Sequence, residues 1–167
     1  MALLRRRLLP TAVRARLHLT AGDALLSVAA LADGTHLAAS RFALHHLRAE
    51  DVASWPWHEV DRASWDPEDT TLRVTLVTGE EIPLALGGDK HRSFTQTVRE
   101  RVQSSVVAAA SRTLPGGAVV RVAVRRRPDG ELYSQVIAPG TVDLAEPATA
   151  RLVDELEDEV RQAAGLP

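Results

Sequence analysis

Alternating apolar and polar residues in the middle of the chain predict antiparallel β-structure. The clearest alternation lies in residues 71–78, where Leu72, Val74 and Leu76 would point to one face of an extended strand. After a Thr-Gly-Glu turn, the alternation resumes in residues 82–86. One face of this hairpin is therefore expected to be buried, and the other is expected to face solvent.

Shorter patterns upstream predict further strands. The dipeptide Asp33-Gly34 marks a hairpin turn, and a kink is expected near Ser40. Pro56 suits only the beginning of a strand or an edge strand, because proline has no amide hydrogen to donate. The strands predicted before the central hairpin comprise residues 17–20, 24–31, 35–39, 42–47 and 55–65.

A helical period follows the central hairpin. Apolar residues recur every four positions from Phe94 to Val106, which predicts an amphipathic helix over residues 92–105. Residues 106–113 could continue that helix, but Ser-Ser followed by Val-Val favours extended chain, so a strand is expected there. A Leu-Pro-Gly-Gly loop at residues 114–117 then separates this region from the rest of the chain.

The last third predicts a second, smaller unit. Alternation in residues 119–126 and 132–138, with Pro-Asp-Gly between them, predicts a β-hairpin. A terminal helix is predicted from the Glu-Pro pair at residues 146–147, because proline is favoured in the first helical turn. A hairpin and one helix bury too little surface to be stable alone, so the helix is expected to cover the sheet of this unit. The apolar stripe of the helix consists of Leu152, Leu156 and Val160.

These elements follow the order of a pleckstrin-homology-like (PH-like) domain, in which about seven short antiparallel strands precede a helix. The stretch DGTHLAASRFALHHL resembles the second and third strands of bacterial PH-like and GRAM-like domains. WPWHEVDRASW is similar to one of their later strands, and LRVTLVTGEEIPLAL followed by SFTQTVRERV resembles their closing hairpin and helix. The resemblance covers about residues 16–106. The whole chain is also similar to a family of small actinobacterial proteins.

The resemblance implies an α+β fold: a PH-like bent antiparallel β-sheet or barrel capped by a helix, then a small β-hairpin unit and a C-terminal amphipathic helix. The expected organisation is a basic N-terminal arm (1–15), a PH-like domain (16–113) and a C-terminal unit (114–167). Lipid-binding PH domains usually have a basic loop between their first two strands. Here that loop contains Ala-Asp-Gly at residues 32–34, which disfavours phosphoinositide binding, and the resemblance specifies no activity.

Composition narrows the function classes. The 167 residues include 20 basic and 22 acidic side chains, and 45% are hydrophobic, as in ordinary globular proteins. The absence of cysteine excludes thiol catalysis and zinc–thiolate sites. A net charge of -2 argues against a protein built around binding nucleic acid, so no nucleic-acid partner is expected.

The N-terminal segment raises the question of membrane contact. Three arginines at residues 5–7 interrupt its leucines, and no apolar run in the chain reaches the roughly 18 residues of a transmembrane helix. No transmembrane segment and a cytoplasmic location are therefore expected. The arm is expected to pack on its own domain, and an arm that lies on a membrane surface is the alternative. The residues expected to pack are Leu3, Leu4, Leu8 and Leu9.

No cofactor or metal site is expected. His45, His46 and His58 are the best candidate ligands, but neighbouring residues of a strand point to opposite faces, so His45 and His46 could not easily share one ion. Asp61 and Asp66, together with His58, could support acid–base chemistry of a hydrolase type, which is the alternative function. Asp61 and Asp66, together with Glu68 and Asp69, lie in or beside a predicted turn, where acidic side chains are normally solvated.

The expected function is a non-enzymatic binding or scaffolding module with a protein partner. Self-association through the C-terminal region is possible. A cluster of arginines could also bind an anion, a lipid headgroup or nucleic acid weakly, although the acidic terminal helix is expected to pair with that cluster. The candidate interaction residues are Trp55, Trp57, Arg121, Arg125, Arg126, Arg127, Leu152, Leu156 and Val160.

Overall fold

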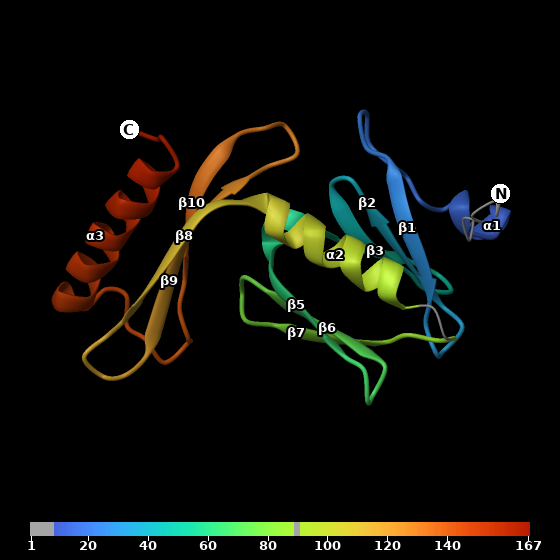
Figure 1. Cartoon of the computed structure of the whole chain (residues 1–167), viewed down its shortest axis with the longest axis horizontal. Helices are drawn as coiled ribbons and strands as arrows, with labels where there is room; N and C mark the ends of the chain where they lie inside the picture. Colours follow the sequence, from blue (N-terminus) through green and yellow to red (C-terminus); the bar gives the residue numbers. More distant parts are fainter. Residues whose placement is uncertain (1–8, 89–90) are drawn as a thin grey trace. The chain divides into compact units, whose positions relative to one another are not determined.

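The computed structural model describes residues 9–88 and 91–167 as two compact α+β units (Figure 1). The first unit contains the described residues up to 76 and from 80 to 102, and the second contains residues 77–79 and 103–167. In these described ranges the strands form three antiparallel sheets, of four, three and three strands. The compact units divide after Val102.

The first unit contains two of the sheets. The four-stranded sheet has the order β1-β2-β3-β4 and the three-stranded sheet has the order β5-β6-β7. The central hairpin is confirmed, because Leu72 pairs with Leu84 and Val74 pairs with Ile82. The strands are β1 (Leu25–Ala30), β2 (His36–Ser40), β3 (Ala43–Leu47), β4 (Val52–Pro56), β5 (Val60–Asp66), β6 (Thr71–Leu76) and β7 (Glu81–Ala85).

Two predicted strands differ from the structure. Residues 17–20 form no strand and instead lead into a turn. The single strand predicted for residues 55–65 is divided by a short 3-10 helix, η1 (Trp57–Glu59), which separates β4 from β5. Pro56 is the last residue of β4, where it pairs with Ala43, and it immediately precedes η1. Its position at a strand end agrees with its lack of an amide hydrogen.

The main core of the first unit combines side chains from both sheets with one face of α2 (Arg92–Ser105). Phe94, Val98 and Val102 are all buried in this core, which confirms the four-residue period of the helix. Leu37 and Leu44 from the four-stranded sheet are fully buried in the same cluster. Each fully buried side chain of this kind stabilises the fold by about 1.5–3 kcal/mol relative to exposure.

The two sheets of the first unit do not close into a barrel, which corrects one of the two forms that the sequence allowed. They meet at one corner through an isolated bridge between Leu31 and Leu86. Next to this bridge, a Cβ atom on Gly87 would lie 2.9 Å from the carbonyl oxygen of Leu31. Only glycine fits such a close backbone approach, so Gly87 permits the contact between the sheets.

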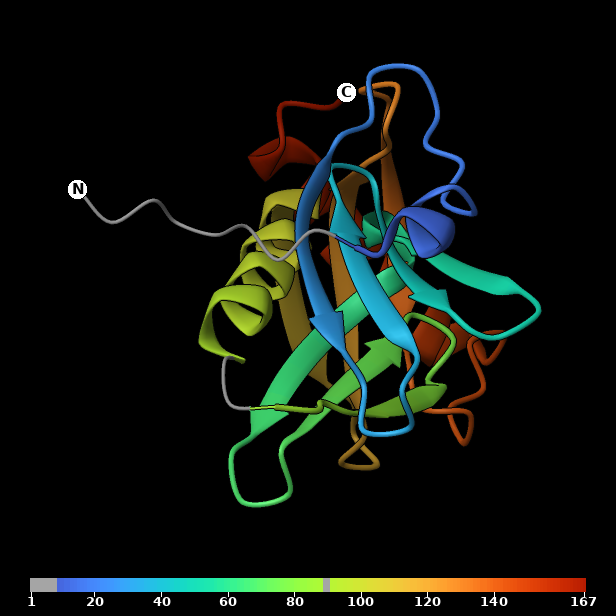
Figure 2. The same ribbon diagram turned by 90° about the vertical axis from the view of Figure 1, so that its right-hand side faces the viewer.

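The four-stranded sheet is also covered on its outer face. Figure 2 shows the short helix α1 (Thr11–Arg14) lying over this face. Leu9 is buried there with Ala38 and Leu47, and Val13 packs against the same cluster. Packing of the N-terminal segment on its own domain is therefore confirmed at Leu9, whereas Leu3, Leu4 and Leu8 lie outside the described residues.

The second unit consists of one sheet and one helix. Its sheet has the order β10-β9-β8, with β8 (Val106–Thr113), β9 (Val119–Arg126) and β10 (Leu132–Ile137). Residues 106–113 are thus a strand and add a third strand to the predicted hairpin. The helix α3 (Pro147–Ala163) covers one face of this sheet.

The apolar stripe of α3 is buried against β9. Leu156 and Val160 are each 2% exposed and pack with Val122 and Val124, while the half-buried Leu152 packs in an adjoining cluster. The carboxylate of Glu146 caps the helix by accepting hydrogen bonds from the amides of residues 148 and 149. The predicted cover of this sheet by the terminal helix is confirmed.

Candidate functional site

The acidic residues of the hydrolase hypothesis do not form one site. Asp61 lies near the beginning of β5 and Asp66 at its end, so about 16 Å of extended strand separates them. Asp66 accepts hydrogen bonds from the backbone amides of Glu68 and Asp69, at 3.0 and 3.4 Å. Its carboxylate therefore stabilises the turn after β5, as the solvated-turn interpretation predicts.

The two adjacent histidines point to different partners. His45 lies 2.7 Å from the hydroxyl of Ser54, whereas His46 lies 2.9 Å from the hydroxyl of Thr35. They project from opposite faces of β3, as expected, and cannot bind one ion together. Among the described residues, no group of three or more histidine, aspartate or glutamate side chains could hold a metal ion.

The arginines of β9 do not form one cationic patch. Arg125 is fully buried and donates a hydrogen bond to Ser105, whereas Arg126 is exposed. Arg127 lies beyond the end of the strand, where it pairs with Glu131 at 2.7 Å and stacks over the ring of Tyr133. The alternation of the strand thus divides these residues, and the predicted patch is wrong as a single surface.

The acidic helix pairs with a different arginine from those predicted. Arg112 of β8 lies 3.3 Å from Glu155 and 3.2 Å from Glu159. Register explains the difference: Val120, Val122 and Val124 of β9 point toward α3, so the alternate residues Arg121 and Arg125 point away from it. In the sequence, a single arginine within an apolar segment does not indicate that it will pair with the acidic helix. Glu157 of α3 also accepts a hydrogen bond from Ser134 of β10.

The tryptophans are not exposed anchors. Trp57 is 4% exposed and its indole donates a hydrogen bond to the backbone carbonyl of Ser40 at 3.0 Å. Trp55 and Trp65 are half-buried and pack against the same core. The sequence favours core positions for Trp57 and Trp65, and the burial of Trp57 and the packing of Trp65 agree with this. The alternative, in which Trp55 and Trp57 share a solvent-facing side as an interaction anchor, is wrong for the buried Trp57.

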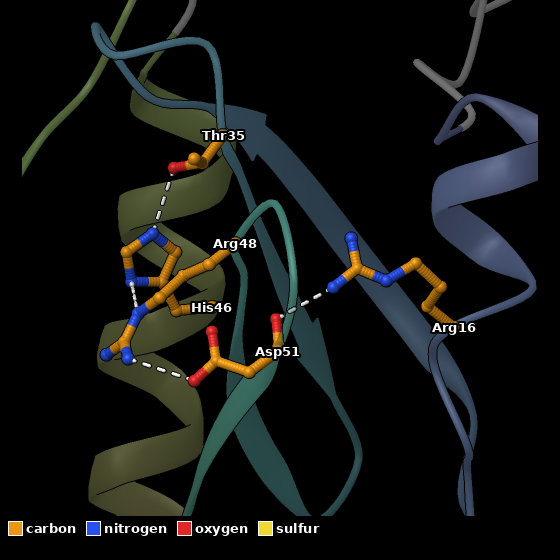
Figure 3. Close-up of polar contacts among 5 residues, drawn as sticks. All are labelled: Arg16, Thr35, His46, Arg48 and Asp51. Carbon is orange, nitrogen blue, oxygen red and sulfur yellow. Dashed lines mark hydrogen bonds and ion pairs between the residues drawn. The ribbon is translucent and has the colours of Figure 1, made fainter.

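A polar network joins the N-terminal segment to one end of the four-stranded sheet (Figure 3). Arg48 lies 3.2 Å from the carboxylate of Asp51, and Arg16 donates a hydrogen bond to the backbone carbonyl of Asp51 at 3.0 Å. Arg48 also approaches His46 at 3.5 Å, and His46 in turn contacts Thr35. The network holds the segment after α1 against the turn between β3 and β4.

Burial and charge in this network act on two titratable groups. Partial burial lowers the pKa of His46, and the neighbouring Arg48 lowers it further. Hydrogen bonds from the side chain and the backbone of Thr35 lower the pKa of Asp33. Both arginines of this network have partners within the chain: Arg48 the carboxylate of Asp51, and Arg16 its backbone carbonyl.

A second network is buried in the outer face of the same sheet. Ser40 is fully buried and lies 2.9 Å from the carboxylate of Asp23 and 3.1 Å from His45. The other nitrogen of His45 contacts Ser54, which is exposed on β4. The sequence did not indicate this network, because its residues come from four separate segments that only strand pairing brings together.

The exposed edge of the second sheet is the remaining candidate surface. In β8, residues at every second position are exposed: Val107, Ala109, Ser111 and Thr113. Val119, which pairs with Thr113, is 51% exposed. β8 also lies at one end of the strand order, so among the described residues no strand pairs with its outer edge.

No protein-family model matches the chain, and no curated protein or solved structure matches it significantly. Within the described residues, no helix is both long enough and apolar enough to cross a membrane.

Proposed function

We propose that the chain is a PH-like binding or scaffolding module that acts through protein contact and not through catalysis. The order of a four-stranded sheet, a three-stranded sheet and a helix in the first unit supports the PH-like part of this proposal. The separation of Asp61 from Asp66 along β5 supports the non-enzymatic part.

The exposed edge of β8 is the observation that carries the binding function. Natural edge strands usually carry charges, prolines or bulges that prevent pairing with another chain. β8 is eight residues long and contains no proline, and its one charged side chain, Arg112, is held by α3. Its one irregularity lies at its beginning, between Val106 and Ala108. The opposite edge strand, β10, is half-buried along its whole length and is less accessible.

The partner that best fits this edge is a second copy of the chain. An antiparallel pair of β8 strands, centred on Ala110, would place Ser111 opposite Ala109 and Thr113 opposite Val107. These residues are small or β-branched, and each pair lies on one face of the joined sheet. The result would be a continuous six-stranded sheet across the two copies.

Charge supports the same pairing. In this register Arg112 lies opposite Ala108 of the second copy, whose small side chain leaves room for the guanidinium group. Each copy brings one arginine and the two carboxylates of Glu155 and Glu159 to the same side of the sheet. Because each Arg112 is already paired with carboxylates of its own copy, the strand pair would not bring two unpaired cations together.

Sedimentation equilibrium of the full chain over a concentration series tests this proposal. We expect a monomer–dimer equilibrium. Val107→Lys should weaken dimerisation by about tenfold or more, because it places a cation on both sides of the symmetric strand pair. Leu26→Lys is the matched control: Leu26 is 43% exposed and lies on β1, whereas Val107 is 38% exposed.

The two variants separate the possible outcomes. A dimer that persists unchanged in Val107→Lys, or that is lost equally in Leu26→Lys, would contradict pairing through β8. A wild-type chain that stays monomeric at the highest concentration would overturn the second copy as the partner.

A further inference from the structure

Asp23, Ser40, His45 and Ser54 form a continuous hydrogen-bonded chain that ends at the protein surface. The carboxylate Oδ2 of Asp23 lies 2.9 Å from Ser40 Oγ, which lies 3.1 Å from His45 Nε2. His45 Nδ1 lies 2.7 Å from Ser54 Oγ. Ser40 is fully buried and His45 is 7% exposed, whereas Ser54 is exposed on the edge strand β4.

The chemistry of Asp23 fixes the direction of these hydrogen bonds. Both carboxylate oxygens of Asp23 accept hydrogen bonds, since Oδ1 also accepts from the amides of Ala24 and Phe42. Ser40 has one hydroxyl hydrogen, and its possible acceptors besides His45 are Asp23 and the carbonyl of Ala43 at 3.1 Å. Ser40 Oγ also accepts hydrogen bonds from the amides of Ala43 at 3.1 Å and Phe42 at 3.3 Å, and the Phe42 amide is shared with Asp23 Oδ1 at 3.2 Å. With the Ser40 hydroxyl hydrogen on Asp23 and the Phe42 amide on Oδ1, Ser40 Oγ keeps one lone pair for His45 Nε2.

In this arrangement His45 Nε2 donates to Ser40. Burial lowers the pKa of His45, and this effect outweighs the opposing influence of Asp23, so the ring is neutral at neutral pH. A neutral imidazole that carries its hydrogen on Nε2 presents a lone pair at Nδ1. Ser54 must then donate its hydroxyl hydrogen to Nδ1, which leaves both lone pairs of Ser54 Oγ directed away from the ring.

We propose that Ser54 is an activated nucleophile that accepts an acyl group from an activated ester, with His45 as its general base. This arrangement contains the elements of nucleophilic activation: an exposed hydroxyl, a base within hydrogen-bond distance and a buried group that orients the base. Ser40 and Asp23 are positioning residues, because they act only through His45. The proposal concerns one covalent event and is independent of dimerisation through β8.

The step balances within the named groups. Ser54 Oγ forms a bond to the carbonyl carbon of the ester, and its proton passes to His45 Nδ1. The bond from that carbon to the alkoxy or aryloxy oxygen then breaks, and the departing oxygen takes the proton from His45. The products are an acyl ester of Ser54 and a free alcohol or phenol, and His45 returns to its neutral form.

Acetylation of the full chain by p-nitrophenyl acetate, followed by peptide mass spectrometry, tests the proposal. Ser64 is the internal control, since it is also exposed on a strand and has no histidine partner among the described contacts. We expect Ser54 to be acetylated about a hundredfold faster than Ser64, the lower range for a positioned general base. His45→Gln should reduce the rate at Ser54 to that at Ser64.

The variant Asp23→Asn distinguishes a positioning role from a purely structural one. Asp23 is the charged group that acts on His45 among the described residues, and it raises the pKa of His45 against the larger effect of burial. Removing its charge should shift the midpoint of the acetylation rate against pH to lower pH. A change in protein stability alone would leave that midpoint in place.

Two results would overturn the proposal. The first is an acetylation rate at Ser54 equal to that at Ser64 in the wild-type chain, which needs no variant and so does not depend on the folding of His45→Gln. The second is an acetylation rate at Ser54 that stays high in a folded His45→Gln protein.

Discussion

The four-stranded sheet of the first unit and the three-stranded sheet of the second differ in how they are covered. The first has an apolar cluster on each face, one shared with α2 and one shared with the N-terminal segment. The second is covered by α3, and β8 remains exposed at alternate positions. Coverage on both faces lets the first sheet hold a buried histidine network, whereas the exposed edge of β8 offers a surface for another chain.

The largest expected effect is a loss of stability confined to the second unit. Leu156→Asp should destabilise the second unit by about 4 kcal/mol, because it removes a buried side chain and buries a carboxylate without a partner. Helix content measured by circular dichroism should fall. Tryptophan fluorescence should change little, since all three tryptophans lie in the first unit.

Leu144→Asp is the control for this prediction. Leu144 is 43% exposed in the same unit, so its substitution should change the free energy of unfolding by no more than about 0.5 kcal/mol. A Leu156→Asp protein with an unchanged melting temperature would show that α3 contributes little to the second unit.

A smaller loss of stability is expected when the packing of the N-terminal segment on the four-stranded sheet is weakened. Leu9→Ala should lower the stability of the first unit by about 2–3 kcal/mol, because Leu9 is 4% exposed and packs on Ala38 and Leu47. Urea denaturation followed by tryptophan fluorescence measures this loss. Leu26→Ala on β1 is the control, and an equal loss in both variants would contradict a specific role of the N-terminal cover.

Local sequence patterns were sufficient to predict those elements that have one buried face and one solvated face. The alternation around Val74 and the four-residue period from Phe94 predicted β6, β7 and α2. The stripe through Leu156 predicted the face of α3 that packs on the sheet. In each case the side chains that repeat along the sequence also lie on one side of one element, so no long-range information was needed.

The candidate sites depended on strand pairing, which those patterns do not encode. His45 contacts Ser54 because β3 pairs with β4 in the register that places these two residues opposite each other. Arg112 contacts α3 because β8 joins the second sheet. The Ser-Ser-Val-Val sequence at the beginning of β8 is compatible with helix or strand. The arginines of β9 were grouped by their nearness in sequence, although alternate residues of a strand lie on opposite faces.

Acid should weaken the two units in different pH ranges, because His45 and His46, whose pKa values are lowered in the folded chain, both lie in the first unit. Burial lowers the pKa of folded His45 below the ordinary 6.5, so between the two values the unfolded chain binds more protons than the folded chain. The stability that neutral His45 provides is present above pH 6.5 and is lost as pH falls through the lowered value. Partial burial also lowers the pKa of His46, so the protonation of His46 by acid weakens the first unit in the same way.

The second unit should respond only at lower pH. Hydrogen bonds from the amides of Ala148 and Thr149 lower the pKa of Glu146 from 4.5, so its capping contribution is lost only as pH falls below 4.5. When urea denaturation is followed by tryptophan fluorescence, the urea concentration at the midpoint should therefore fall as the pH is lowered from 6.5 to 4.5. In His45→Gln this midpoint should fall less steeply with pH. Equal slopes in the wild type and in His45→Gln would mean that His45 is as easily protonated in the folded chain as in the unfolded one, and the neutral ring that orients Ser54 would then lose its support.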